Sequence, residues 1–352
     1  MSLFAFDLES VQELGAWAGT DGVRVSRGPG GGRGRTVTDQ PARQAAPAAS
    51  AASAVAEGMP SPAWTLPAAV AAAPAAAEAV AAKAAYENFP VALRMLPRRY
   101  REHLMAVYVF ARTADDLGDQ APAAERLRLL AELEADVGLL YAGGGAEGPK
   151  LPAVRGLART VTECAVPSQP FVDLIRANQQ DQVVTRYQTF DDLAGYCRLS
   201  ANPVGRIVLH VFGCFSADRA QQSDLICTGL QLAEHWQDVA EDLRAGRIYL
   251  PLEDLAVHDC SERDLTAGRA GPAVRELMAF EVGRARSLID AGAPLVGTLR
   301  GAARAAVAGY VAGGRAALAA VAAADYDVLA ATPRPGKLRT AAELVTAFAR
   351  GR

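Results

Sequence analysis

Four polar side chains recur on one face of an otherwise apolar segment, LMAVYVFARTADDLGDQ at 104–120. Tyr108, Arg112, Asp115 and Asp119 stand at i, i+4, i+7 and i+11, which is the spacing of one helical face. Because the segment is mostly apolar, this face should point inward. Carboxylates in apolar surroundings are costly unless they are paired or bind a metal. We name this set the first acidic stripe.

A second acidic stripe lies in CTGLQLAEHWQDVAEDLRAGRIYLP at 227–251. Gln231, Glu234, Asp238 and Asp242 occupy one helical face by the same spacing. Either stripe alone can arise by chance on a solvated helix. Two stripes on core-like helices indicate a shared purpose, because carboxylates four residues apart can hold Mg²⁺, which prefers oxygen ligands. Two facing helices can hold several such ions with a diphosphate between them.

The chemistry that these stripes predict is the departure of a diphosphate group. Metal ions neutralise the diphosphate as its carbon–oxygen bond breaks, which makes it a better leaving group. A cation such as Arg112 can assist, and aromatic rings in the apolar interior can stabilise the carbocation that remains. The candidate aromatic residues are Phe89, Tyr108 and Tyr196.

The composition and the missing motifs exclude several other classes of protein. With 36 Lys and Arg against 39 Asp and Glu, the formal net charge is −3, which excludes a strongly basic nucleic-acid binder. The five cysteines form no CxxC pair and indicate buried thiols in a reducing compartment. The glycines at 143–148 satisfy GxGxxG without a preceding strand, and GxxxxGK[ST], HExxH and GxSxG are absent. The first ten residues lack a secretory pattern, so we expect a cytoplasmic protein.

The chain divides into a low-complexity tail and one helical domain. Residues 1–82 are rich in Gly, Pro, Ala and Ser without apolar periodicity, which predicts disorder, and residues 83–352 carry the predicted all-α domain. We expect helices at about 91–117, 123–141, 152–164, 169–184, 190–213, 218–244, 273–292, 296–324 and 338–349. Two pairs, Thr189 with Asp192 and Ser261 with Asp264, have the spacing of a helix N-cap and its partner. The apolar stretch at 301–325 contains Arg304 and Arg315, which favours a buried core helix over a membrane span.

Several segments together resemble the squalene/phytoene synthase family, over roughly residues 84–345. The segments are YENFPVALRMLPRRYREHLMAVYVFARTADDLGD, YCRLSANPVG at 196–205, LQLAEHWQDVAEDLRAGRIYLP and the closing ALAAVAAADYDVLAATPRPGK. The resemblance implies a single-domain, all-α isoprenoid-synthase-like bundle with a central apolar cavity, and Mg²⁺-dependent chemistry on prenyl diphosphates.

The resemblance also assigns roles by position. It implies that Asp115, Asp116, Asp119, Asp238 and Asp242 bind Mg²⁺-diphosphate and that Arg112 contacts the diphosphate. It implies that Tyr196, Val204, Gly205 and Gln231 line the cavity, although Val204 and Gly205 are equally explained as helix-packing residues. Many family members carry Asn where this chain has Glu234, which keeps an oxygen ligand but adds charge.

Within the family, ENFPV at 87–91 followed by LPRRYREHLMAVYVFAR resembles the bacterial hydroxysqualene synthase branch of hopanoid pathways. That branch converts presqualene diphosphate to hydroxysqualene with release of diphosphate. One alternative is a sister enzyme that condenses two prenyl diphosphates head to head to give presqualene diphosphate or phytoene. Another is a non-catalytic helical binding protein of the same fold. The sequence leaves peripheral membrane contact and the oligomeric state open, and it indicates no nucleic-acid partner.

Overall fold

The structure is a computed structural model that describes residues 96–143 and 148–350. The predicted tail at 1–82 and the candidate Phe89 lie outside the described residues. Within them the chain is helical, with a single isolated β-bridge between Arg186 and Ile248. The helices are α5 Arg98–Asp119, α6 Arg126–Tyr141, α7 Pro152–Cys164, α8 Gln169–Gln180, α9 Phe190–Ser200, α10 Asn202–Val211, α11 Ala217–Gln237, α12 Val239–Arg244, α13 Leu252–Val257, α14 Glu262–Leu265, α15 Pro272–Gly292, α16 Leu295–Thr298, α17 Gly301–Ala323 and α18 Lys337–Arg350. The all-α prediction is confirmed.

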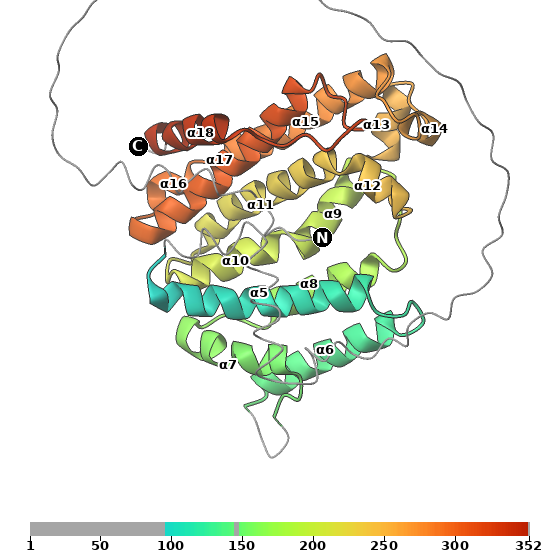
Figure 1. Ribbon diagram of the computed structural model, residues 1–352. Coiled ribbons are helices and arrows are strands. Elements are labelled where there is room, and N and C mark those ends of the chain that lie inside the picture. The colour runs from blue at the N-terminus through green and yellow to red at the C-terminus, as the bar shows by residue number, and fades with distance from the viewer. Residues whose placement is uncertain (1–95, 144–147, 351–352) are drawn as a thin grey trace, which may run out of the picture.

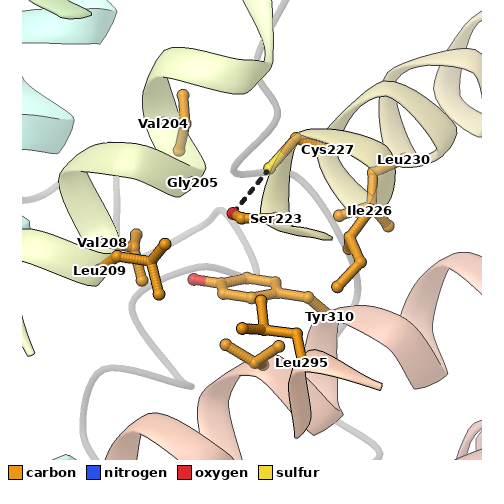
Figure 2. Close-up of a pocket in the computed structure, with 11 residues that line it drawn as sticks. Val204, Gly205, Val208, Leu209, Ser223, Ile226, Cys227, Leu230, Leu295 and Tyr310 are labelled. Atoms are coloured by element: carbon orange, nitrogen blue, oxygen red, sulfur yellow. Dashed lines mark hydrogen bonds between the residues drawn. The ribbon is translucent and has the colours of Figure 1, made fainter. Parts of the chain in front are cut away.

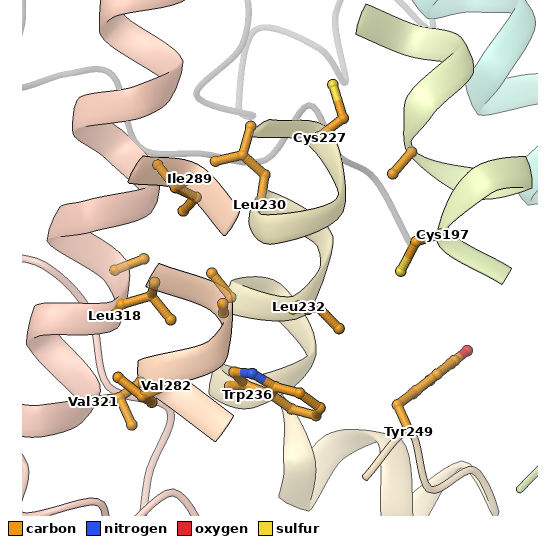
Figure 3. Close-up of a cluster of buried hydrophobic side chains, with 14 of the residues drawn as sticks. Cys197, Cys227, Leu230, Leu232, Trp236, Tyr249, Val282, Ile289, Leu318 and Val321 are labelled. Carbon is orange, nitrogen blue, oxygen red and sulfur yellow. The ribbon is translucent and has the colours of Figure 1, made fainter. Parts of the chain in front are cut away.

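Two apolar clusters hold the bundle together and meet at α10 (Figure 1). One cluster joins α5, α6, α7 and α8, with the T-shaped pair of Phe110 and Phe171 at its centre. The other joins α9, α11, α15 and α17 around Trp236 (Figure 3). Val204 and Phe212, at the two ends of α10, pack against both clusters. The two acidic stripes therefore belong to different clusters, and α10 lies between those clusters.

The structure corrects the predicted helix boundaries in several places. The predicted helix at 190–213 is two helices, because Pro203 has no N–H for a continuous helix and instead begins α10. The predicted helix at 218–244 ends at Gln237 and restarts as α12, with Asp238 between the two. Aspartate is favoured at such a position because it suits a helix N-terminus.

Two further boundaries differ, and two short helices were not predicted. The predicted helix at 296–324 is α16 followed by α17, and Gly301, which begins α17, has a φ of 54°. Of the predicted helix at 91–117, the part at 91–95 lies outside the described residues; α5 begins at Arg98, after Pro97, and runs on to Asp119. The short helices α13 and α14 were not predicted, because one or two turns carry too little periodicity to be recognised.

The predicted caps are confirmed. Thr189 accepts a hydrogen bond from the Asp192 N–H at 3.2 Å, and the Thr189 N–H donates to the Asp192 carboxylate at 3.0 Å. At Ser261, the backbone N–H donates to Asp264 at 2.8 Å, which completes the corresponding capping box of α14. These boxes satisfy N–H groups that a helix terminus otherwise leaves unpaired.

Helix α17 is long and apolar enough to cross a membrane by length and composition, yet 67% of its most apolar window is buried inside the fold. The prediction of a core helix is confirmed, since α17 packs against α11, α15 and α18. The neighbouring pair α11 and α15 approach closely at Gly229, where an added Cβ would lie 2.6 Å from Ile289 Cγ1 and 2.9 Å from the Ala285 carbonyl oxygen. Only glycine fits that crossing.

Candidate active site

The first acidic stripe reaches the site through Asp115 and Asp119 on α5. Asp115 lines a polar pocket of about 380 Å³ and accepts a hydrogen bond from Asn178 Nδ2 of α8 at 3.2 Å. Burial raises the pKa of Asp115, and the nearby charge of Asp119 acts in the same direction. Asp119 lies at the end of α5, where it forms an ion pair with Arg247 Nη2 at 3.0 Å.

The other predicted residues of α5 lie elsewhere. Arg112 Nε contacts the Asp116 carboxylate at 3.0 Å, and Asp116 also accepts a hydrogen bond from Gln120. Tyr108 is 1% exposed in the apolar cluster that joins α5, α6, α7 and α8, and it does not line the polar pocket. Direct roles for Arg112, Asp116 and Tyr108 therefore stay predictions.

The second acidic stripe spans the break between α11 and α12. Gln231 lines the same polar pocket as Asp115, and its Nε2 lies 3.2 Å from His235 Nε2. Burial, followed by the charges of Asp238, Asp115 and Asp242, raises the pKa of Glu234 to about 8. Asp115 of the first stripe and Gln231 of the second line the same pocket, so the two stripes face each other there.

Asp238 and Asp242 extend this cluster of carboxylates. Burial, together with the charges of Glu241 and Asp242, raises the pKa of Asp238 to about 6. Asp242 is 8% exposed and lines a smaller pocket of about 200 Å³ with His235, Arg247 and Tyr249. Glu234, Asp238 and Asp242 thus follow one another along the break between α11 and α12.

A half-buried aspartate that the sequence analysis missed, Asp181, lines the polar pocket. Tyr196 donates its hydroxyl to Asp181 Oδ2 at 2.7 Å, and Tyr249 donates to Oδ1 at 3.2 Å. Burial raises the pKa of Asp181. The rings of Tyr187, Tyr196 and Tyr249 form a triangle with all three centroid separations at 5.7 Å. His235 stacks on Tyr249 at 3.8 Å.

The segment after α12 places Arg247 and Tyr249 by backbone pairing. The Ile248 N–H donates to the Thr185 carbonyl at 3.0 Å, and the Leu252 N–H donates to the Tyr187 carbonyl at 2.9 Å. The isolated bridge between Arg186 and Ile248 belongs to this pairing. Arg247 and Tyr249 are within the quoted motif GRIYLP, but neither shares a helical face with the stripes, so spacing alone gave no reason to select them.

An apolar pocket of about 490 Å³ lies further along α11 (Figure 2). Val204 and Gly205 of α10 line it together with Cys227 and Leu230 of α11, as Figure 2 shows, and the Tyr310 ring closes another side. A Cβ on Gly205 would lie 2.3 Å from Ser223 Oγ and 2.5 Å from Cys227 Sγ. Gly205 therefore lines the apolar pocket, and its lack of a side chain also allows α10 to approach α11 closely.

The donor set fits a hard divalent cation. Glu234 Oε2 and Asp242 Oδ2 are buried and have no hydrogen-bond partner in the part of the chain that the structure describes. His235 Nδ1 lies 3.8 Å from Asp242 Oδ2. Carboxylate oxygens without another partner are the kind of ligand that Mg²⁺ prefers. No three His, Cys, Asp or Glu side chains within 96–143 and 148–350 are close enough to hold an ion by themselves, so further oxygen ligands are required.

An all-α bundle with carboxylates of two helices facing across a polar pocket, beside an apolar pocket, has the architecture of isoprenoid synthases. The sequence profile of the squalene/phytoene synthase family matches residues 82–341, and the chain belongs to that family. The resemblance stated from the motifs is thereby confirmed.

The relatives that match this chain include both hydroxysqualene synthases and phytoene synthases. The hydroxysqualene synthase of Rhodopseudomonas palustris is 35% identical over 217 residues, which cover 61% of this chain and 72% of that protein. The phytoene synthase of Arthrospira platensis is 34% identical over 214 residues, covering 57% and 68% of the two chains. In structure, the squalene synthase HpnC from Alicyclobacillus acidocaldarius matches with a TM-score of 0.66 and 40% identity, over 71% of this chain and 94% of that one. The chain is an enzyme of isoprenoid synthesis that acts on prenyl diphosphates, as its family does.

Proposed function

We propose that this enzyme converts presqualene diphosphate to hydroxysqualene, with release of diphosphate and with Mg²⁺ as cofactor. The observation that carries the proposal is the facing of the two acidic stripes: Asp115 of α5 and Gln231 of α11 line one polar pocket, and Asp115 contributes to the raised pKa of Glu234. The similarity to hydroxysqualene synthases and to the squalene synthase HpnC supports the choice of substrate.

The carboxylates would hold the diphosphate end of the substrate through the metal. The proposed ligands are Asp115, Asp116, Asp119, Glu234, Asp238 and Asp242. Bound Mg²⁺ supplies charge neutralisation for the diphosphate as it leaves. Arg247, which contacts Asp119 at 3.0 Å, adds a fixed positive charge at the same end of the pocket.

The remaining residues would contact the hydrocarbon part of the substrate. The apolar pocket between α10 and α11 offers Val204, Val208 and Leu230 to a prenyl chain and excludes water from it. Tyr196 lines the polar pocket with Asp115, Tyr249 lines the smaller pocket with Asp242, and the faces of both rings favour a cation. Asp181 keeps both tyrosine hydroxyls turned toward itself, so the orientation of these rings is held by hydrogen bonds.

The test is to incubate the purified protein with presqualene diphosphate, with and without Mg²⁺, and to identify the extracted product by mass spectrometry. We expect hydroxysqualene only when Mg²⁺ is present. Hydroxysqualene at the same rate in the presence of EDTA would refute the role of the metal. No conversion of presqualene diphosphate under either condition would refute the proposed reaction.

The alternative function is head-to-head condensation of two prenyl diphosphates, which the 34% identity to a phytoene synthase favours. The metal ligands would be the same, so only the substrate separates the two reactions. Farnesyl diphosphate supplied alone, followed by geranylgeranyl diphosphate alone, tests this alternative. Formation of presqualene diphosphate or phytoene from either substrate would favour it over the hydroxysqualene reaction.

The proposed substrate also bears on the cellular location of the enzyme and on its contact with a membrane. We propose that the enzyme works in the cytoplasm and contacts the membrane peripherally, since its substrate and product are apolar. Sedimentation of the purified protein with lipid vesicles tests the membrane contact.

A further inference from the structure

One hydroxyl group in the polar pocket, that of Ser200, has no hydrogen-bond partner among residues 96–143 and 148–350. Ser200 lines this pocket together with Tyr196, Asp181 and Gln231, and its Oγ atom is buried. No residue in the described part of the chain hydrogen-bonds to Ser200 Oγ. Buried hydroxyls in folded proteins nearly always bond to protein or to an ordered water, because leaving them unpaired is costly. An unpaired hydroxyl facing a polar pocket therefore points to a small polar occupant.

The break between α9 and α10 explains why Ser200 lies there. Ser200 is the last residue of α9 and follows Tyr196 by four residues, so both side chains lie on the same helical face. Pro203, three residues later in the first turn of α10, has no N–H with which to continue α9. Asn202 Oδ1 then accepts a hydrogen bond from Thr228 at 3.0 Å, which ties the break to α11. The position of the Ser200 hydroxyl is thus set by two neighbouring helices.

The occupant that fits is water. The pocket of about 380 Å³ has room for one, since a water molecule takes up about 30 Å³ in the liquid. Its polar lining offers Ser200 Oγ, the Tyr196 hydroxyl and the Gln231 amide, which is enough to hold a water by two or three hydrogen bonds. The apolar pocket along α11 has a mainly aliphatic lining; of its two hydroxyls, Ser223 contacts Cys227 Sγ and the other belongs to Tyr310.

We propose that Ser200 Oγ positions the water molecule that captures the carbocation, which decides that the product is an alcohol. The inference rests on the proposed function. The substrate's carbon–oxygen bond breaks and both of its electrons leave with the diphosphate. After rearrangement, the cationic carbon accepts a lone pair from the oxygen of the water held by Ser200, and a new carbon–oxygen bond forms.

The oxonium that results must lose one proton. That proton passes to the Tyr196 hydroxyl as the hydrogen of this hydroxyl passes to Asp181 Oδ2, along the 2.7 Å hydrogen bond between them. Electrons and protons then balance without an oxidant or reductant. Burial raises the pKa of Asp181, which makes its carboxylate a better proton acceptor than a surface aspartate.

The test compares two variants of nearly equal shape, Ser200→Thr, which keeps the hydroxyl, and Ser200→Val, which replaces it with a methyl group. Each is incubated with presqualene diphosphate and Mg²⁺ in ¹⁸O-labelled water, and both the diphosphate released and the labelled hydroxysqualene are measured. Ser287→Ala is the control, since Ser287 is exposed on α15 and bonds only to the Gly283 carbonyl.

We expect Ser200→Val to release diphosphate within about threefold of the wild-type rate. The share of substrate that becomes hydroxysqualene should fall at least tenfold, with hydrocarbons formed by proton loss in its place. Ser200→Thr and Ser287→Ala should keep the wild-type share. An unchanged alcohol share in Ser200→Val would overturn the proposal, and so would an equal loss of diphosphate release and alcohol, because ionisation would then be the affected step.

Two further comparisons distinguish a folding defect, a wrong proposed function and a wrong role for Ser200. If Ser200→Val does not give the circular dichroism spectrum of the wild type, Ser200→Ala, which removes only the hydroxyl oxygen, is measured with the same expectation. A wild-type enzyme that makes no alcohol from presqualene diphosphate refutes the proposed function itself. A wild type that makes the alcohol, beside a Ser200→Ala variant that makes the same share, refutes only the role of Ser200.

Discussion

Replacement of Glu234 by Gln should stabilise the metal-free protein at alkaline pH and weaken its response to Mg²⁺. Glu234 lies among Asp115, Asp238 and Asp242, and burial with these neighbours raises its pKa to about 8. Above that pH the folded protein must keep an ionised, crowded carboxylate whose Oε2 atom has no hydrogen-bond partner among the described residues. Gln keeps the shape of the side chain and removes the charge.

The sign and size of the effect follow from proton linkage. Between pH 4.5 and 8 the folded state binds more protons at Glu234 than the unfolded chain, so stability falls as the pH rises through this window. The rise from 4.5 to about 8 corresponds to about 5 kcal/mol. We expect about 2–5 kcal/mol, because water and side chains rearrange around an ionised group. Glu234→Gln should therefore exceed the wild type by that amount at pH 9 and match it at pH 4.5.

Urea denaturation of both proteins at pH 4.5, 7 and 9 in EDTA measures the difference directly. Asp115 and Asp238, whose pKa values are also raised, interact with Glu234, so the difference reports Glu234 together with their response to the loss of its charge. Glu262→Gln is the control with the opposite sign, since the hydrogen bond from Arg186 lowers the pKa of Glu262. If wild type and Glu234→Gln show the same pH dependence, the crowding inferred for Glu234 is refuted.

Addition of Mg²⁺ provides a second readout of the same variant. A cation held by Glu234 and its neighbours stabilises the folded state, so Mg²⁺ at pH 8 should raise the unfolding midpoint of the wild type. The rise should be smaller in Glu234→Gln, because one charged ligand is missing. Equal rises in the two proteins would remove Glu234 from the set of proposed metal ligands.

Three other substitutions test further parts of the structure. Asp115→Asn should reduce diphosphate release at least a hundredfold with an unchanged circular dichroism spectrum, while Asp173→Asn on α8 should not; near-normal turnover would exclude Asp115 as a metal ligand. Gly205→Ala should cost about 1–3 kcal/mol in urea denaturation, because its Cβ would lie 2.3 Å from a neighbouring side chain; an unchanged midpoint would show that α10 and α11 can separate freely. Asp136→Ala should cost about 1–3 kcal/mol, because Asp136 is 4% exposed and accepts two N–H groups from 150–151; loss of less than about 0.5 kcal/mol would contradict this.

Much of the site could be predicted because helical spacing places residues on a face without any knowledge of the fold. Asp115 and Gln231 were selected by that spacing, and they do line one pocket. Spacing gave no reason to select Asp181, which directly follows the last residue of α8, or Ser200, the last residue of α9, because neither belongs to an acidic stripe. It also failed to show that Asp238 separates two helices, because no Pro or Gly marks the break.

The sequence by itself determined the all-α class, the family and the two acidic stripes, because helix periodicity and local motifs depend on residues close together in the chain. Only the tertiary structure decided which carboxylates face each other, since that depends on how α5 and α11 pack through other helices. It also decided that Asp181 binds Tyr196 and Tyr249, which lie 15 and 68 residues away along the chain. Burial raised the pKa of Glu234 and left the Ser200 hydroxyl without a hydrogen-bond partner in the described part of the chain, and burial arises only when distant segments exclude water together.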